Sequence, residues 1–192
     1  MAKLSLVPGG QTEQNRFESL IEPHYATLHR VAYRFTGSLP DAEDLVQETC
    51  VRAYRHIDKL CGLEDPRGWM ILVMRRLFID QTRRYDRNNV RSIDEAPEGS
   101  TTSDRPDPAE AAESELMARR IQRGLKRLSN EHRALLVLHD MEGYSLQELE
   151  QITGVKIGTI KSRLHRARVK LGRLLQSDRD FAAADVLGGV RS

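Results

Sequence analysis

The chain has 192 residues, of which 39% are hydrophobic and 30% are charged, a composition typical of a soluble protein with one or two compact domains. No apolar run approaches the roughly 20 residues that a membrane span needs. Residues 1–14 lack the apolar stretch of a secretory signal. Two cysteines are too few for a disulfide framework and fit a reducing compartment. We therefore expect a cytoplasmic protein without membrane insertion.

A formal net charge of +2 conceals three strongly charged blocks. Residues 67–91 carry seven arginines and two aspartates, residues 92–115 carry eight acids and one arginine, and residues 156–173 carry seven basic residues and no acid. Solvent-exposed helix faces normally interleave both signs, whereas unmixed basic blocks are typical of nucleic-acid binding. The segregation favours a nucleic-acid partner.

The N-terminal half is predicted to form three helices. Apolar residues recur at steps of three and four over residues 17–35, which indicates a helix with one buried face. Residues 37–40 end it, and Asp41 can cap a second helix. The buried face of that second helix is expected to carry Ala42, Val46, Cys50, Ala53 and Ile57. After a loop at residues 61–66, a third helix is expected over residues 67–84.

The middle of the chain has the composition of a linker. Residues 89–112 combine proline, glycine, serine and threonine with many acids, and they cannot bury enough apolar surface to fold alone. No segment shows the alternation with period two that marks a strand. The sequence therefore predicts an all-α fold with two small helical domains, residues 13–88 and 113–176, joined by an acidic flexible linker.

The C-terminal half is predicted to contain a helix-turn-helix. Two helices come first, the second capped by Ser129 or Asn130. A capping box at residues 145–148 then begins a short helix, a tight turn follows at residues 153–155, and a basic helix occupies residues 156–175. A short helix, a turn with glycine and a longer basic helix are typical of this motif, whose second helix enters the major groove of DNA.

The basic helix has an inward and an outward face. Ile160 and Leu164 lie four residues apart and can pack onto the domain. The side chains that then point outward have groups suited to bases and phosphates, and they are Thr159, Ser162, His165 and Arg166. Lys161 and Arg163 flank them and suit phosphate contacts. The alternative is a basic surface helix without a ligand.

Three motifs resemble those of extracytoplasmic-function (ECF) RNA polymerase sigma factors of the sigma-70 superfamily. Residues 158–168 resemble their recognition helix, residues 41–49 resemble their polymerase-binding helix, and residues 66–70, with Asp80 and residues 83–84, resemble their segment for the −10 element. The motifs stand in the order of the family and are separated by the acidic linker. The resemblance implies a subunit that directs polymerase to promoters, without catalysis or cofactor of its own.

The resemblance also implies which residues contact each partner. Binding of core RNA polymerase, through the clamp coiled coil of its largest subunit, would use four outward side chains, Asp44, Leu45, Gln47 and Glu48. Capture of the melted −10 element would use Arg67, Trp69, Arg75, Arg76, Arg83 and Arg84. Trp69 can equally be a core residue. Recognition of the duplex −35 element would use Thr159, Lys161, Ser162, Arg163, His165 and Arg166. The polymerase flap and an anti-sigma factor are the further partners expected.

Some features depart from the family pattern or leave alternatives open. Arg76 stands where the family usually has asparagine, and Cys50 replaces a large apolar residue. Glu150 occupies a position where helix-turn-helix units prefer a small residue, so it is expected to snorkel or to widen the helix crossing. Residues 181–192 are either disordered or a short partner-binding addition.

Other classes of function fit parts of the sequence. A stand-alone helix-turn-helix regulator, with a sensing or dimerising first domain, is the second reading of the same pattern. A regulatory binding module without DNA function is the third, but it does not explain the basic helix at residues 156–173. A metal site is a further alternative, because Cys50, His56 and Cys61 lie near one another in the sequence, but no Cys-x-x-Cys or His-x-x-x-His pair accompanies them.

Overall fold

The computed structural model describes the backbone of residues 10–88 and 108–188, and the side chains of residues 13–81 and 113–177. These residues form helices and a π-helical turn, and no strand occurs among them. The elements are α1 (Gly10–Thr36), α2 (Leu39–Tyr54), α3 (Ile57–Cys61), α4 (Pro66–Asn88), α5 (Pro108–Lys126), α6 (Asn130–Leu136), η1 (Val137–Met141), α7 (Leu146–Thr153) and α8 (Ile157–Gly188). The all-α prediction is confirmed. Most of the predicted linker, residues 89–107, lies outside the described residues, and α5 begins earlier than expected.

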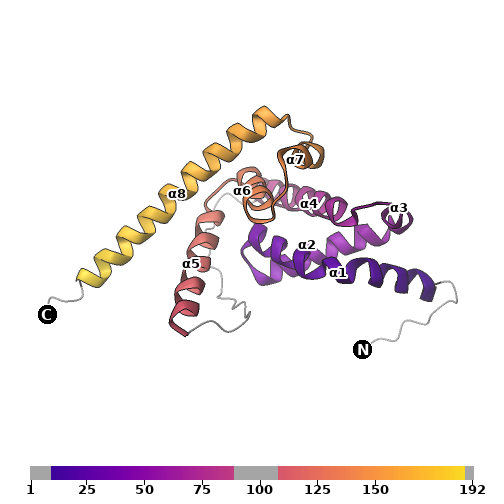
Figure 1. Cartoon of the computed structure of the whole chain (residues 1–192), viewed down its shortest axis with the longest axis horizontal. Coiled ribbons are helices and arrows are strands. Elements are labelled where there is room, and N and C mark those ends of the chain that lie inside the picture. Colours follow the sequence, from indigo (N-terminus) through magenta and orange to yellow (C-terminus); the bar gives the residue numbers. More distant parts are fainter. Residues whose placement is uncertain (1–9, 89–107, 189–192) are drawn as a thin grey trace.

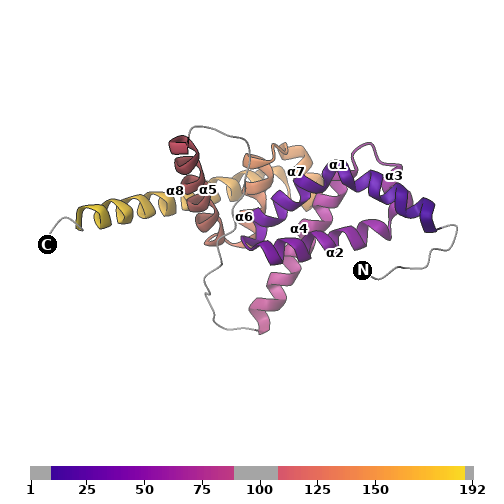
Figure 2. The same ribbon diagram turned by 90° about the horizontal axis from the view of Figure 1, so that it is seen from below.

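The N-terminal domain consists of α1 packed on α2, with α4 against both (Figures 1 and 2). Its core includes Phe35 of α1, whose ring stacks on that of Phe78 of α4 at a centroid distance of 5.1 Å. The chain reverses at Gly37, where φ is +71°, a conformation that glycine adopts at little cost. The prediction that Asp41 caps the second helix is wrong. Ser38 is the N-cap, because a proline in the first turn starts the helix earlier.

The C-terminal domain contains the predicted helix-turn-helix, formed by α7 and α8. Its capping box is confirmed: the Ser145 hydroxyl accepts from the Glu148 amide at 3.2 Å, and the Ser145 amide donates to the Glu148 carboxylate at 2.7 Å. These bonds lower the pKa of Glu148. Gly154 ends α7 with φ at +68°. Helix α8 projects from the domain as one long rod (Figure 1) and stays helical to Gly188, beyond the predicted end at residue 175.

The two domains share one contiguous apolar core. Arg133 of α6, 7% exposed, lies at their junction. The Arg133 guanidinium donates to two carbonyls in the last turn of α5, those of Leu125 at 2.8 Å and Lys126 at 2.7 Å. It also donates to the carbonyl of Phe35 in α1. It also lies 5.6 Å from the centre of the Phe78 ring. One buried cation therefore joins the C-terminal ends of two helices, where the backbone carbonyls lack the amide donors of a continuing helix.

Two further contacts cross the junction. The carboxylate of Glu142 follows η1, is 5% exposed, and pairs with Arg30 at 2.9 Å and with Arg34. The Arg67 guanidinium of α4 lies over the Tyr144 ring, 5.6 Å from its centre. The junction was not predicted from the sequence, which indicated two domains separated by a linker.

Candidate functional site

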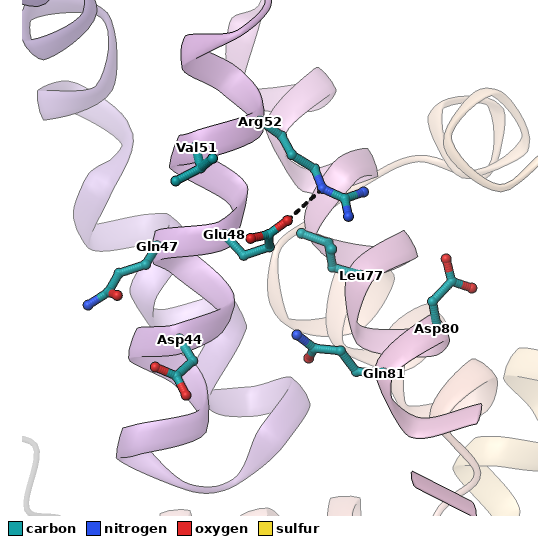
Figure 3. A pocket seen from close by; sticks show the side chains of 8 residues that line it. All are labelled: Asp44, Gln47, Glu48, Val51, Arg52, Leu77, Asp80 and Gln81. Carbon is teal, nitrogen blue, oxygen red and sulfur yellow. Dashed lines mark hydrogen bonds and ion pairs between the residues drawn. The ribbon is translucent and has the colours of Figure 1, made fainter. Parts of the chain in front are cut away.

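The first candidate surface is a groove between α2 and α4, which we call the α2–α4 groove (Figure 3). Its volume is about 550 Å³. The residues that line it are mostly acids and amides, namely Asp44, Gln47, Glu48, Val51, Arg52, Leu77, Asp80 and Gln81. Glu48 pairs with Arg52 at 3.0 Å across one helical turn. Three carboxylates against one guanidinium leave the groove acidic, and this charge suits a basic partner.

The structure places three of the four predicted polymerase-binding residues on this groove and contradicts the fourth. Asp44, Gln47 and Glu48 line it. Leu45 was expected to point outward, but its side chain is fully buried. The reason is that α2 packs against both α1 and α4, so its buried arc includes Leu45 and Thr49 as well as the predicted row.

The predicted −10 residues have diverse surroundings. Arg67 and Arg76 are exposed, although Arg67 already lies over Tyr144. Arg75 is only 8% exposed, so the prediction that it lies along single-stranded DNA is wrong. It shares the inward row of α4 with Ile71 and Ile79, four residues before and after it. Arg83 and Arg84 belong to α4, but their side chains lie outside the described residues.

Trp69 combines the two readings that the sequence left open. Its side chain is half-buried against the core. The exposed ring of His56 meets it edge to face at a centroid distance of 5.6 Å. Sequence reasoning did not assign His56 to this surface, and no local pattern could have done so, since the two residues belong to different elements.

The second candidate surface is the exposed side of α8, which we call the reading face and define by Thr159, Ser162, His165 and Arg166. All four are exposed, while Ile160 and Leu164 are buried, as predicted. A short chain of hydrogen bonds orders this face. The Ser162 hydroxyl donates to the Thr159 carbonyl at 2.9 Å, and the Arg166 guanidinium donates to the Ser162 carbonyl at 3.2 Å.

Two basic residues of α8 are held by acids of other elements. Arg163, predicted as a phosphate contact, is only 28% exposed and pairs with Glu131 of α6 at 2.7 Å. Arg168 pairs with Asp140 of η1 at 2.5 Å. These two arginines hold α8 against the domain. The basic side chains of residues 156–173 that are exposed and pair with no acid among the described residues are Lys156, Lys161, Arg166, Lys170 and Arg173.

The potential beside the reading face is positive. Burial lowers the pKa of His132 in α6, and the neighbouring Arg166 and Arg163 lower it further. His132 therefore stays neutral at neutral pH, and its lowered pKa reflects the positive potential of the two arginines. A positive surface beside exposed hydrogen-bonding groups suits duplex DNA.

The described residues give no support for the metal alternative. They contain no group of three or more potential ligands placed to hold an ion. Cys50 is half-buried, and burial raises the pKa of its thiol. None of the described helices is long and apolar enough to cross a membrane.

Comparison with known families decides between a sigma factor and a stand-alone regulator. Residues 20–88 match Sigma-70 region 2, and residues 118–171 match Sigma-70, region 4. The ECF RNA polymerase sigma factor SigL of Mycobacterium tuberculosis is 39% identical over 163 residues, which cover 82% of this chain and 88% of SigL. The chain belongs to the ECF RNA polymerase sigma factors. The predicted family is thereby confirmed, and the stand-alone regulator is not favoured.

Other relatives and solved structures of sigma factors agree. SigE of Mycolicibacterium smegmatis is 34% identical over 164 residues, and the match spans 85% of this sigma factor but only 63% of SigE. The sigma factor RpoE, solved with the anti-sigma factor NepR from Bartonella quintana, has a TM-score of 0.64 at 26% identity and covers 84% of this chain and 98% of its own. CnrH, solved with the cytosolic domain of CnrY, has a TM-score of 0.58 at 26% identity, and the match covers 86% of this chain and 90% of CnrH.

Proposed function

We propose that this sigma factor binds core RNA polymerase through the α2–α4 groove and recognises the −35 element through the reading face of α8. The observation that carries this proposal is the reading face: four polar side chains are exposed together on α8, while Ile160 and Leu164 anchor the opposite side. The protein acts as a non-catalytic subunit in the cytoplasm, where the polymerase performs the chemistry. The polymerase flap is a further expected contact of the C-terminal domain.

Polymerase binding is tested by reversing one charge in the groove. Asp44→Arg places a cation where a basic partner helix would dock, and like charges in a desolvated contact cost enough to weaken binding by about tenfold or more. Glu43→Arg is the matched control, because Glu43 is an exposed acid on the same helix that does not line the groove. The readout is co-elution with core polymerase. Equal binding by the two variants would show that the partner docks elsewhere.

The −10 element is proposed to contact the surface around α4. Arg67 and Arg76 would lie along the DNA backbone, and Trp69 with His56 would offer aromatic faces for an unpaired base. Arg83 and Arg84, further along α4, would extend the basic track. Arg76→Ala is expected to slow promoter opening, measured by permanganate reactivity of unpaired thymines. Unchanged opening would remove α4 from the −10 contact.

Within the reading face, base recognition is separated from phosphate binding by two alanine substitutions. Arg166 is expected to contact a base edge, so Arg166→Ala should reduce cognate binding by about 1–3 kcal/mol and relax preference at one position. Lys170, one turn further on, should contact phosphate, so Lys170→Ala should weaken all duplexes alike. Competition among single-base promoter variants measures both effects. A uniform loss for Arg166→Ala would assign that residue to phosphate.

An anti-sigma factor is the proposed regulatory partner. The support is that RpoE was solved in complex with the anti-sigma factor NepR, and CnrH in complex with the cytosolic domain of CnrY. Both structures cover the two domains of this chain.

A further inference from the structure

We propose that Glu150 is a positioning residue for the recognition helix, because its side chain caps the N-terminus of α8 from the preceding helix. Glu150 belongs to α7, and one of its carboxylate oxygens accepts a hydrogen bond from the backbone amide of Ile157 at 3.1 Å. Ile157 is the first residue of α8. Glu150 therefore does not simply snorkel into solvent, which was one of the two accommodations expected from the sequence. This inference rests on the proposal that α8 reads promoter DNA.

The N-terminus of α8 needs an acceptor that its own N-cap cannot supply. The amides of Thr159 and Ile160 both donate to the carbonyl of Lys156, at 2.9 Å and 3.1 Å, which makes Lys156 the N-cap. Helix N-caps are normally serine, threonine, aspartate or asparagine, whose side-chain oxygen accepts from an amide of the first turn. A lysine side chain has no acceptor. Glu150 supplies the missing oxygen from outside the helix, and its negative charge suits the positive end of the helix dipole.

Glu150 also fixes the turn between the two helices. Its backbone carbonyl accepts from the amide of Gly154 at 2.8 Å, while its side chain accepts from Ile157. The amide of Val155, between them, donates to the hydroxyl of Thr153 at 3.2 Å. One residue of α7 thus binds both the beginning and the end of the turn. The direction in which α8 leaves the turn follows from these bonds.

The cap is coupled to the reading face through the first turns of α8. Thr159 lies two residues after the capped amide, its carbonyl accepts from Ser162, and Ser162 in turn holds Arg166. Loosening the first turn would therefore move the groups that meet base edges. The carboxylate has a second, opposite effect, because a negative charge at a helix N-terminus repels DNA phosphates that could bind there. Removing the hydrogen bond and removing the charge should have different consequences.

Two substitutions separate the hydrogen bond from the charge. Glu150→Gln keeps an oxygen acceptor and removes the charge, whereas Glu150→Ala removes both. Gln151→Ala, at an exposed neighbouring position of α7, is the control. The assay uses holoenzyme assembled from the full chain and core polymerase, and a −35 duplex selected by the wild type from a randomised library. The measured quantity is the ratio of dissociation constants for scrambled and selected duplexes.

We expect Glu150→Ala to reduce this ratio by about fivefold to tenfold, the effect of losing a helix cap. Glu150→Gln should stay within about twofold of the wild type and bind both duplexes more tightly, since it no longer repels phosphate. Loss of folding alone would weaken both duplexes equally and leave the ratio unchanged. An unchanged ratio in Glu150→Ala, or an equal loss in the glutamine variant, would overturn the proposal.

Amide hydrogen exchange tests the cap without DNA. In the free full chain, exchange at Ile157 should accelerate by about fivefold to tenfold in Glu150→Ala and remain slow in Glu150→Gln. Exchange that is the same in the alanine variant and the wild type would refute the cap directly. Failure of the wild type to select any −35 duplex would instead refute the proposed function, while the exchange measurement would still decide the role of Glu150.

Discussion

Replacing Arg133 by methionine is expected to destabilise both domains at once. Methionine fills much of the space of the arginine stem but removes the guanidinium. The carbonyls of Lys126, Phe35 and Leu125 would lose the hydrogen bonds from the guanidinium, although Leu125 would keep the one from the Leu128 amide at 3.0 Å, and the contact with the Phe78 ring would disappear. Two of these carbonyls belong to α5 and one belongs to α1, so the loss falls on both sides of the domain junction.

The size of the effect follows from two opposing quantities. Each hydrogen bond from a charged donor to a buried carbonyl contributes about 1.5–3 kcal/mol. Against this, burial lowers the pKa of Arg133 to about 10, and a shift of this size corresponds to a desolvation cost of about 3 kcal/mol. The three bonds outweigh that cost, and we expect a net loss of about 3 kcal/mol in the free energy of unfolding. For a chain of this length the melting temperature should fall by about 6–12 °C.

Thermal unfolding followed by circular dichroism measures the change. Arg127→Met is the matched control, because Arg127 is an exposed arginine close by in the chain, and its loss should shift the melting temperature by no more than about 2 °C. Arg133→Lys keeps a charge but not the planar fork, so its melting temperature should lie between those of the wild type and Arg133→Met. If Arg133→Met and Arg127→Met melt together, the guanidinium does not stabilise the junction as argued.

Three further outcomes are expected. Tyr144→Phe should leave the free energy of unfolding unchanged at neutral pH or raise it by up to about 1 kcal/mol in urea titrations, because the buried hydroxyl has no hydrogen-bond partner among the described residues. Burial raises the pKa of Tyr144 to about 12, whereas a tyrosine in the unfolded chain ionises near pH 10. The free energy of unfolding of the wild type should therefore fall as the pH rises from about 10 to 12, and Tyr144→Phe should lose about 2 kcal/mol less over this range. Glu142→Gln should lower the free energy of unfolding by about 2–3 kcal/mol in thermal melts, because Glu142 is buried. Arg30→Gln, at the half-exposed end of the same pair, should lower it by less than about 1 kcal/mol. Equal losses would show that the difference in burial does not matter. The slope of the logarithm of DNA affinity against the logarithm of salt concentration should be about −4. Lys161→Ala should make this slope less steep by about one unit, whereas Arg168→Ala should change it little because Arg168 is already paired with Asp140. Equal changes in the two variants would refute this distinction.

Local signals in the sequence predicted the helices well. The capping box at Ser145, the tight turn around Gly154 and the end of the first helix at Gly37 depend on residues within a few positions of one another, and all three were predicted correctly. The cap at Asp41 was wrong because a proline nearby decides where the helix begins. The role of Arg133 was not predictable, since its partner Phe35 lies 98 positions away in the chain.

The inward and outward sides of α8 were predicted correctly from the spacing of its apolar residues. Ile160 and Leu164 anchor α8 as their spacing indicates. Leu45 and Arg75 were wrongly predicted to be exposed. Helices α2 and α4 each pack against several other helices, so more of their surface is buried than one row of apolar residues indicates. The pairing of Arg163 was invisible because its acidic partner is on another helix. Glu150 was recognised as unusual, but its acceptor role depends on how the two helices cross.

The contact between Arg67 and Tyr144 competes with one of the proposed DNA contacts. Arg67 cannot lie over that ring and along a DNA backbone at the same time, so if Arg67 contacts the −10 element as proposed, this DNA binds molecules in which the Arg67–Tyr144 contact is broken. The apparent dissociation constant is then larger by the reciprocal of the fraction of such molecules. Each 1.4 kcal/mol or so that favours the Arg67–Tyr144 contact weakens such binding about tenfold. Substitutions that weaken this contact should therefore tighten binding of the −10 element even as they lower the melting temperature.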